Sequence, residues 1–202
     1  MKSRGRSPTV QEMLNYWEYR ANSYYIEDPF GRAILRAFID KLQPKSLIEI
    51  GCGNGELLSL YKNIPAAVAV DWSENMLKRA NLRKARHFLP NLRLWRHDIT
   101  QCAPNGQYDV AVTRTVLMHI PPDAIKKTVR HVVKCADQFL IFEYFESVQT
   151  EPLAAHNWLH DYVPLFEKEG CELVESYVRQ DLPQVLFQFQ KKKGVIADAK
   201  EA

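Results

Sequence analysis

The feature that most constrains the fold is a cluster of glycines, Gly51-Cys52-Gly53-Asn54-Gly55, directly after a short apolar segment at residues 46–50. A run of Leu and Ile of this length is typical of a buried strand. Glycines after such a strand let the backbone turn tightly and approach a ligand closely. Residues 56–61 are predicted to open a helix after the turn. A strand, a glycine turn and a helix in this order indicate an α/β fold.

The rest of the chain continues the alternation of strands and helices. Short apolar segments predict strands over residues 66–70, 92–95, 109–112, 139–142, 172–178 and 185–189. Helical spacing of apolar residues predicts helices near residues 73–80, 121–133 and 157–168. Such near-continuous apolar strands are typical of a parallel sheet covered on both faces. Residues 181–183, Asp-Leu-Pro, predict a turn that makes the last two strands antiparallel neighbours.

Two further helices are predicted before the first strand. The first has Ser7 as its cap and Pro8 in its first turn, and the second runs over residues 30–42. With 202 residues, 46% of them hydrophobic and 25% charged, the chain has the size and composition of one globular domain. We therefore expect a single domain over residues 1–202. It would comprise N-terminal lid helices over about 8–42, a Rossmann-like core over 45–190 and a flexible tail over 191–202.

Composition excludes several classes of protein. No apolar run approaches the ~20 residues of a membrane helix, and no apolar region follows the basic start as in a secretory signal, so we expect no membrane partner and a cytoplasmic location. The net charge of +3 is too small to identify a partner, and the basic residues near both ends are interpreted as solvated tails rather than nucleic-acid contacts. The four cysteines show no C-x-x-C spacing, so neither a metal site nor a disulfide framework is expected.

The spacing of the glycines also separates two kinds of ligand. The fingerprint of dinucleotide-binding proteins is G-x-G-x-x-G. Here the third glycine comes one residue early, and Glu56 follows it. A pyrophosphate would meet that carboxylate at the start of the helix. The spacing therefore disfavours a nicotinamide-dependent dehydrogenase.

Several motifs together resemble those of the class I S-adenosylmethionine-dependent methyltransferases. Residues 47–55 resemble the first motif of the family, and residues 68–77 resemble the acidic end of its second strand. Residues 96–99 resemble its adenine-binding segment, and residues 109–120 resemble its fourth-strand segment. Residues 16–21 resemble its N-terminal lid helix. The resemblance covers roughly residues 10–190. It implies a Rossmann-like three-layer sandwich with a seven-stranded sheet of order 3-2-1-4-5-7-6, the last strand antiparallel, and S-adenosyl-L-methionine as the cofactor.

The resemblance implies a role for several of these residues at the carboxyl ends of the strands. Asp71 would accept hydrogen bonds from both ribose hydroxyls. Trp72 would pack on the adenine or in the core. Asp98 would accept the adenine amino group, and Ile99 would donate its backbone N–H to the ring. Glu49 would organise the glycine turn or hold the ammonium group of the ligand.

The other expected cofactor contacts are Gly51, Cys52, Gly53, Met76, Arg114, Tyr16 and Tyr24. The backbone of Arg114 would touch the methionyl part, while its side chain would face the acceptor. Tyr16 and Tyr24, with Tyr19 and Tyr25, form an aromatic cluster in the lid region. These rings would either enclose the sulfonium or the acceptor, or simply pack against the helix.

Methyl transfer requires alignment of the reactants and, for some acceptors, removal of a proton. The candidate bases are His119, His156, His160, Asp161 and Glu143. On a helix, His156 and His160 would share a face, beyond the fifth strand where the family builds its substrate pocket. Such a pair suits general-base chemistry near neutral pH, but it would also suit a metal ion or a plain surface position. His119 is either a base or a packed turn residue.

We therefore predict methyl transfer to a small-molecule acceptor, because the catalytic fold takes up almost the whole chain. Oxygen is the preferred acceptor atom, since His160 or His156 could deprotonate a hydroxyl; a carboxylate would need no base, and an amine only deprotonation in solution. An RNA or protein methyltransferase is an alternative, although residues 113–116 read Thr-Arg-Thr-Val where many base N-methyltransferases have N/D-P-P-Y/F. A non-catalytic cofactor-binding module is another. We expect a monomer or a homodimer.

Overall fold

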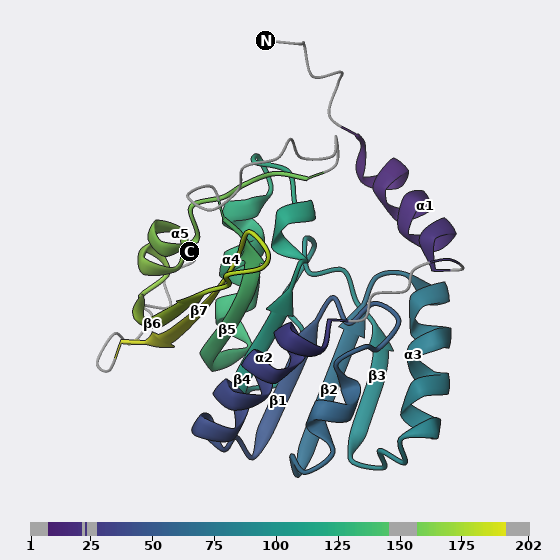
Figure 1. Ribbon diagram of the computed structural model, residues 1–202. Helices are drawn as coiled ribbons and strands as arrows, with labels where there is room; N and C mark the ends of the chain where they lie inside the picture. Colours follow the sequence, from purple (N-terminus) through teal and green to yellow (C-terminus); the bar gives the residue numbers. More distant parts are fainter. Residues whose placement is uncertain (1–7, 22, 24–27, 146–156, 193–202) are drawn as a thin grey trace.

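The computed structural model describes residues 8–21, 23, 28–145 and 157–192 (Figure 1). Seven strands form one sheet of order β3-β2-β1-β4-β5-β7-β6. The strands are β1 (Ser46–Ile50), β2 (Ala66–Asp71), β3 (Leu92–Arg96), β4 (Tyr108–Arg114), β5 (Ala136–Tyr144), β6 (Cys171–Val178) and β7 (Gln184–Lys191). Neighbours from β3 to β5 are parallel, and β7 is antiparallel to both β5 and β6. The predicted strand order and antiparallel last strand are confirmed.

Helices cover both faces of the sheet. On one face, α2 (Pro29–Leu42), α3 (Glu74–Arg86) and the short 3-10 helix η1 (Leu58–Tyr61) pack on the sheet; on the other lie α4 (Ile125–Lys134) and α5 (Tyr162–Lys168) (Figure 1). Strand β1 shows how the sequence serves both layers. Leu47 packs with the α2 side and Ile48 with the α4 side, because successive residues of a strand point to opposite faces. No helix among the described residues is long and apolar enough to cross a membrane.

The N-terminal region departs from the sequence-based expectation at two points. Helix α1 (Val10–Arg20) is capped by Thr9, whose hydroxyl accepts the N–H of Glu12 while the Glu12 carboxylate accepts the N–H of Thr9. This capping box corrects the predicted cap at Ser7, a residue that lies outside the described part of the chain. Helix α2 buries Ile34, Leu35 and Ile39 against the sheet, so it is a layer of the core rather than part of a lid.

Two predicted helices are shorter in the structure. After the glycine turn, in which Gly55 takes a φ of +84°, only η1 forms in place of a helix over 56–61. Helix α5 begins at Tyr162 rather than near residue 157. A helix from residue 157 would hold Pro164 in its interior, where proline lacks the N–H of the helical hydrogen bond; the start at Tyr162 places it in the first turn. Ahead of the helix, the N–H of Trp158 donates to the carbonyl of Met118 at 2.7 Å.

Candidate active site

A cavity of about 840 Å³ opens at the carboxyl ends of the central parallel strands, where a parallel sheet places its ligand site. It lies next to the glycine turn, the ends of β1, β2 and β4, and residues of α1. The sequence-predicted residues that line it are Glu49, Gly51, Cys52, Gly53, Asp71, Trp72, Met76, Asp98, Ile99, Arg114 and His119. The fold therefore brings together most of the candidates that the motifs indicated.

The glycine turn and the end of β2 hold each other through Asp71. Its Oδ2 accepts the N–H of Gly53 at 2.8 Å, and its Oδ1 accepts the N–H of Ser73 at 2.9 Å. A Cβ at Gly51 would lie 2.4 Å from a methyl group of Val116, so only glycine fits there, and the φ of +73° reinforces this. Burial raises the pKa of Asp71 to about 6, so the carboxylate is largely ionised at neutral pH.

Glu49, near the end of β1, is a buried carboxyl group on the cavity wall. Its side chain is 3% exposed, and its Oε2 has no hydrogen-bond partner among the described residues. Burial raises the pKa of Glu49 to about 8, so the group is mostly protonated at neutral pH. A buried oxygen without a partner is costly. A ligand that brings a hydrogen-bond donor or a cation to the Oε2 of Glu49 would give this oxygen a partner.

The segment after β3 supplies the neighbouring part of the wall. In the parallel pairing of β2 and β3, Asp71 lies beside Arg96, so the two strands end at the same edge of the sheet. Asp98 follows β3 at that edge. The Oδ1 of Asp98 accepts the N–H and the hydroxyl of Thr100, at 2.9 and 2.6 Å. These contacts fix the carboxylate beside the cavity.

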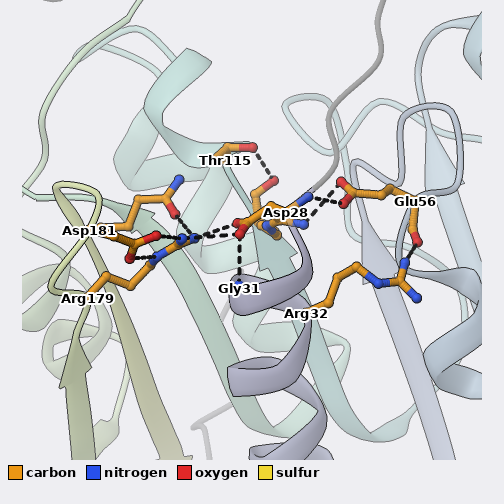
Figure 2. Close-up of polar contacts among 9 residues, drawn as sticks. Asp28, Gly31, Arg32, Glu56, Thr115, Arg179 and Asp181 are labelled. Atoms are coloured by element: carbon orange, nitrogen blue, oxygen red, sulfur yellow. Dashed lines mark hydrogen bonds and ion pairs between the residues drawn. The ribbon is translucent and has the colours of Figure 1, made fainter.

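A second wall of the cavity is built from ion pairs (Figure 2). Arg114, at the end of β4, pairs with Asp28 and with Glu56, the latter with Nη1 and Oε2 3.1 Å apart. Arg179, which follows β6, binds Asp28 through both Nη atoms and Asp181 through Nε and Nη2. The side chains of Arg114 and Arg179 are 8% and 1% exposed, so both charges are buried, whereas Asp181 is 50% exposed.

Asp28 is the centre of this network. Its Oδ1 accepts the N–H of Gly31 at 2.9 Å, which makes it the N-cap of α2. Burial acts to raise the pKa of Asp28, but hydrogen bonds from Arg179 and Gly31 and the charges of Arg114 and Arg179 outweigh it, so the pKa lies below its usual value. A Cβ at Gly31 would come within 2.2 Å of the Asp28 carboxylate, which requires glycine there.

His119 is the one predicted base among the described residues that lines the cavity. Its ring lies edge-on to that of Trp17, with centroids 4.8 Å apart. His160 is not brought to the cavity: it is buried before α5, and its Nε2 lies 2.9 Å from the carbonyl oxygen of Ile120. Because a carbonyl only accepts, this nitrogen carries the proton and donates it. Burial lowers the pKa of His160, which keeps the ring neutral.

His160 lies ahead of α5, so the prediction that it shares a helical face with His156 is wrong for His160. His156 lies outside the described residues. Asp161 is an exposed residue ahead of α5. Tyr24 and Tyr25 also lie outside the described residues, and Tyr16 packs edge-on against Trp17 at 5.1 Å. Of these two rings, Trp17 lines the cavity.

Glu143, at the end of β5, acts as a structural anchor rather than a base. It is fully buried and accepts hydrogen bonds from the backbone N–H groups of Val116, Leu117 and Met118, at 2.9, 3.0 and 3.3 Å, and from the hydroxyl of Thr113 at 3.2 Å. Burial raises the pKa of Glu143 to about 7. The carboxylate holds the loop that carries His119 to the cavity.

Sequence reasoning missed much of the wall built from ion pairs. The residues it did not select are Met13, Trp17, Asp28, Phe30, Tyr144, Arg179, Asp181 and Gln184. Asp28 directly precedes Pro29, a pattern typical of a helix start, and that signal could have placed it as a cap. No comparable local signal marks Arg179 or Asp181.

Comparisons with known proteins agree with this geometry. A family model described as a methyltransferase domain matches residues 16–189. The chain is 30% identical, over 110 residues, to an uncharacterized protein of Haemophilus influenzae, and the match covers 52% of this chain and 43% of that protein. The chain therefore spans less than half the length of this curated relative.

Two solved structures show the same fold at low identity. Magnesium protoporphyrin IX methyltransferase of Synechocystis, with bound S-adenosylmethionine, has a TM-score of 0.70 at 14% identity and covers 88% of this chain and 91% of its own. An S-adenosylmethionine-dependent methyltransferase of Clostridium acetobutylicum has a TM-score of 0.68 at 11% identity, with coverage of 91% and 99%.

Proposed function

The chain belongs to the methyltransferase-domain family, within the class I S-adenosylmethionine-dependent methyltransferases, and from that premise we propose that it transfers a methyl group from S-adenosylmethionine to a small-molecule acceptor. The observation that carries the proposal is Asp71, which joins the glycine turn to the end of β2 at the wall of the cavity. The similar enzyme of Synechocystis is named for a small molecule, magnesium protoporphyrin IX, which supports an acceptor of that class.

The residues of the cavity fit this cofactor. Each oxygen of Asp71 accepts one backbone N–H and keeps a lone pair, so the carboxylate can accept both hydroxyls of a ribose. Asp98 uses Oδ1 for Thr100, which leaves Oδ2 for the amino group of adenine. The unpartnered Oε2 of Glu49 fits an ammonium group, the cation that this buried oxygen lacks.

The chain's own task is then to position the acceptor and to handle one proton. When bound, S-adenosylmethionine supplies a methyl group on a cationic sulfur, so no metal or covalent intermediate is required of the protein. Trp17 and His119 form a packed aromatic edge of the cavity that limits the access of water. We favour oxygen as the acceptor atom, because the His119 imidazole at this wall can take a hydroxyl proton.

Calorimetric titration tests the cofactor assignment. We expect the protein to bind S-adenosylmethionine and S-adenosylhomocysteine but not NADH. Asp71→Ala should weaken binding of both by roughly 1.5–3 kcal/mol, the scale of a hydrogen bond to a charged group.

Asp109→Ala is the matched control, because Asp109 also accepts two backbone N–H groups, from Lys45 and Ser46, but lies outside the cavity. An equal loss of affinity in both variants would mean that Asp71 acts on folding alone. Binding of NADH would overturn the assignment.

A further inference from the structure

We propose that the methyl acceptor carries a positively charged group that binds beside Asp181. The inference rests on the proposed function, because it specifies the acceptor of the same site. It is carried by the charges that line the cavity and by the way Arg179 there is already used.

Acidic groups dominate the lining of the cavity. Six carboxyl side chains face two guanidinium groups, and none of the described lining residues is a lysine. The carboxyl groups are those of Asp28, Glu49, Glu56, Asp71, Asp98 and Asp181. A cleft lined by one sign of charge raises the local concentration of ligands of the opposite sign.

Arg179 has no donor left for an anion. A guanidinium group has five N–H donors. Those of Arg179 make hydrogen bonds to Asp28, Asp181 and the side-chain oxygen of Gln184, five in all. Its positive charge is shared between two carboxylates, so a carboxylate or phosphate on the acceptor would find neither a vacant donor nor a net positive charge there.

Arg114 is only partly used by the same network. One Nη donates to Glu56 and the other to Asp28, while its buried Nε has no hydrogen-bond partner among the described residues, and the side chain is 8% exposed. Three carboxylates and two guanidinium groups thus line this half of the cavity. The guanidinium of Arg32, which is not among the lining residues, binds the backbone carbonyl of Glu56.

Asp181 is the open carboxylate of the network. Its side chain is 50% exposed, whereas that of Asp28 is 11% exposed. Each of its oxygens accepts one N–H from Arg179, as Figure 2 shows. Each oxygen keeps a further lone pair. It lies in the turn between β6 and β7, at the cavity, where an ammonium group can reach it from solvent.

Aromatic rings complete a lining suited to a cation. Trp17, Phe30 and Tyr144 border the cavity together with Asp181. Faces of aromatic rings attract cations, and the combination of such rings with a carboxylate is the usual chemistry for binding an organic ammonium group. Phe30 is 45% exposed, and the guanidinium of Arg179 lies over its ring, 5.4 Å from the centroid.

The charged group is an anchor and not the reacting atom. A protonated amine has no lone pair with which to attack the methyl carbon, so the nucleophile must be another atom of the same molecule. With oxygen as the nucleophile, the acceptor class is an amine-bearing alcohol or phenol.

The test separates acceptors by charge. A small-molecule extract is divided by ion exchange into cationic, neutral and anionic fractions, and each is incubated with the protein and methyl-labelled S-adenosylmethionine. We expect labelled product from the cationic fraction. Label from the neutral or anionic fraction alone would overturn the inference. If calorimetry shows cofactor binding but no fraction is labelled, the acceptor is not a small molecule. This inference and the proposed acceptor class would then both be wrong, whereas the cofactor assignment would stand.

A pair of variants then locates the anchor. Asp181→Asn should raise the KM of the labelled cationic acceptor about tenfold and weaken its binding to the S-adenosylhomocysteine-loaded protein equally, as expected for loss of one charge partner at a partly exposed site. The affinity for S-adenosylmethionine should not change. Asp137→Asn is the control, since Asp137 is an exposed partner of Lys191 outside the cavity. An unchanged KM in Asp181→Asn would remove Asp181 from the site.

Discussion

The two halves of the cavity are held together by different interactions. In the half assigned to the cofactor, Asp71 binds backbone N–H groups, one of them 18 residues away in the sequence at Gly53. In the half assigned to the acceptor, side-chain ion pairs join residues as far apart as Asp28 and Arg179, which are separated by 151 residues. The first half depends on backbone geometry, and the second on the identity of each side chain.

This difference has an energetic consequence. Backbone N–H donors are present whatever the residue type, proline excepted, so the Asp71 carboxylate alone can join the glycine turn to the end of β2. A buried ion pair, in contrast, leaves an uncompensated charge when one partner is removed. We therefore expect substitutions of the buried ion-pair residues in the acceptor half to act mainly on folding, and those in the cofactor half mainly on binding.

His119, held by the loop that Glu143 anchors, gives the largest expected effect on turnover. His119→Ala should lower turnover of an oxygen acceptor by about 10²–10⁴, the usual contribution of a general base. His160→Ala is the control, and turnover per folded molecule should stay within about twofold because its Nε2 already donates to a carbonyl. Single-turnover rates with matched protein concentrations check this. If the two variants were equally impaired, the assignment of the base to the cavity wall would fail.

Asp28→Ala should give the largest loss of stability. It leaves Arg114 and Arg179 with fewer carboxylates and removes the cap of α2, so the free energy of unfolding should fall by about 3 kcal/mol. Urea unfolding measures this. Asp40→Ala is the control, because Asp40 is 61% exposed and pairs with Arg36 at 3.6 Å, and it should change stability by about 0.5 kcal/mol or less. Equal effects would show that the acceptor half does not depend on its ion pairs.

The pH dependence of cofactor binding is the smallest expected effect. The pKa of Glu49 is about 8 in the free protein, against an ordinary value of 4.5. Below about 8 the folded state holds a proton that an incoming ammonium group must displace, so affinity should rise with pH by up to about tenfold per unit and then level off. For the free protein, the same shift means that this group lowers stability as pH rises from 4.5 towards 8, because the unfolded state has already lost the proton.

Calorimetry across this pH range, in buffers of different ionisation enthalpy, measures the proton released on binding. Glu49→Gln should abolish the release and flatten the profile. A wild-type profile without slope would show that Glu49 does not meet the ammonium group, and the contrast between the two halves would then rest on Asp71 alone.

Much of the fold could be predicted from the sequence, and the exceptions lie at the ends of helices. The strands were recognisable because residues such as Leu47 and Ile48 serve opposite layers, which makes each strand a continuous apolar run. The helix predicted from residue 157 begins only at Tyr162, because an earlier start would place Pro164 in the helix interior. The apolar spacing alone did not take that proline into account.

By itself, the sequence predicted the residues of the half that we propose for the cofactor. The glycine turn and Asp98 follow strands and Asp71 ends one, and the ends of parallel strands meet at one edge of a sheet. Only the tertiary structure decided the acceptor half. An Asp or Arg that will be buried in an ion pair has the same local signature as one that stays in solvent, because charge pairing depends on distance in space. The position of Arg179 between Asp28 and Asp181, and of His160 away from the cavity, was fixed by that packing.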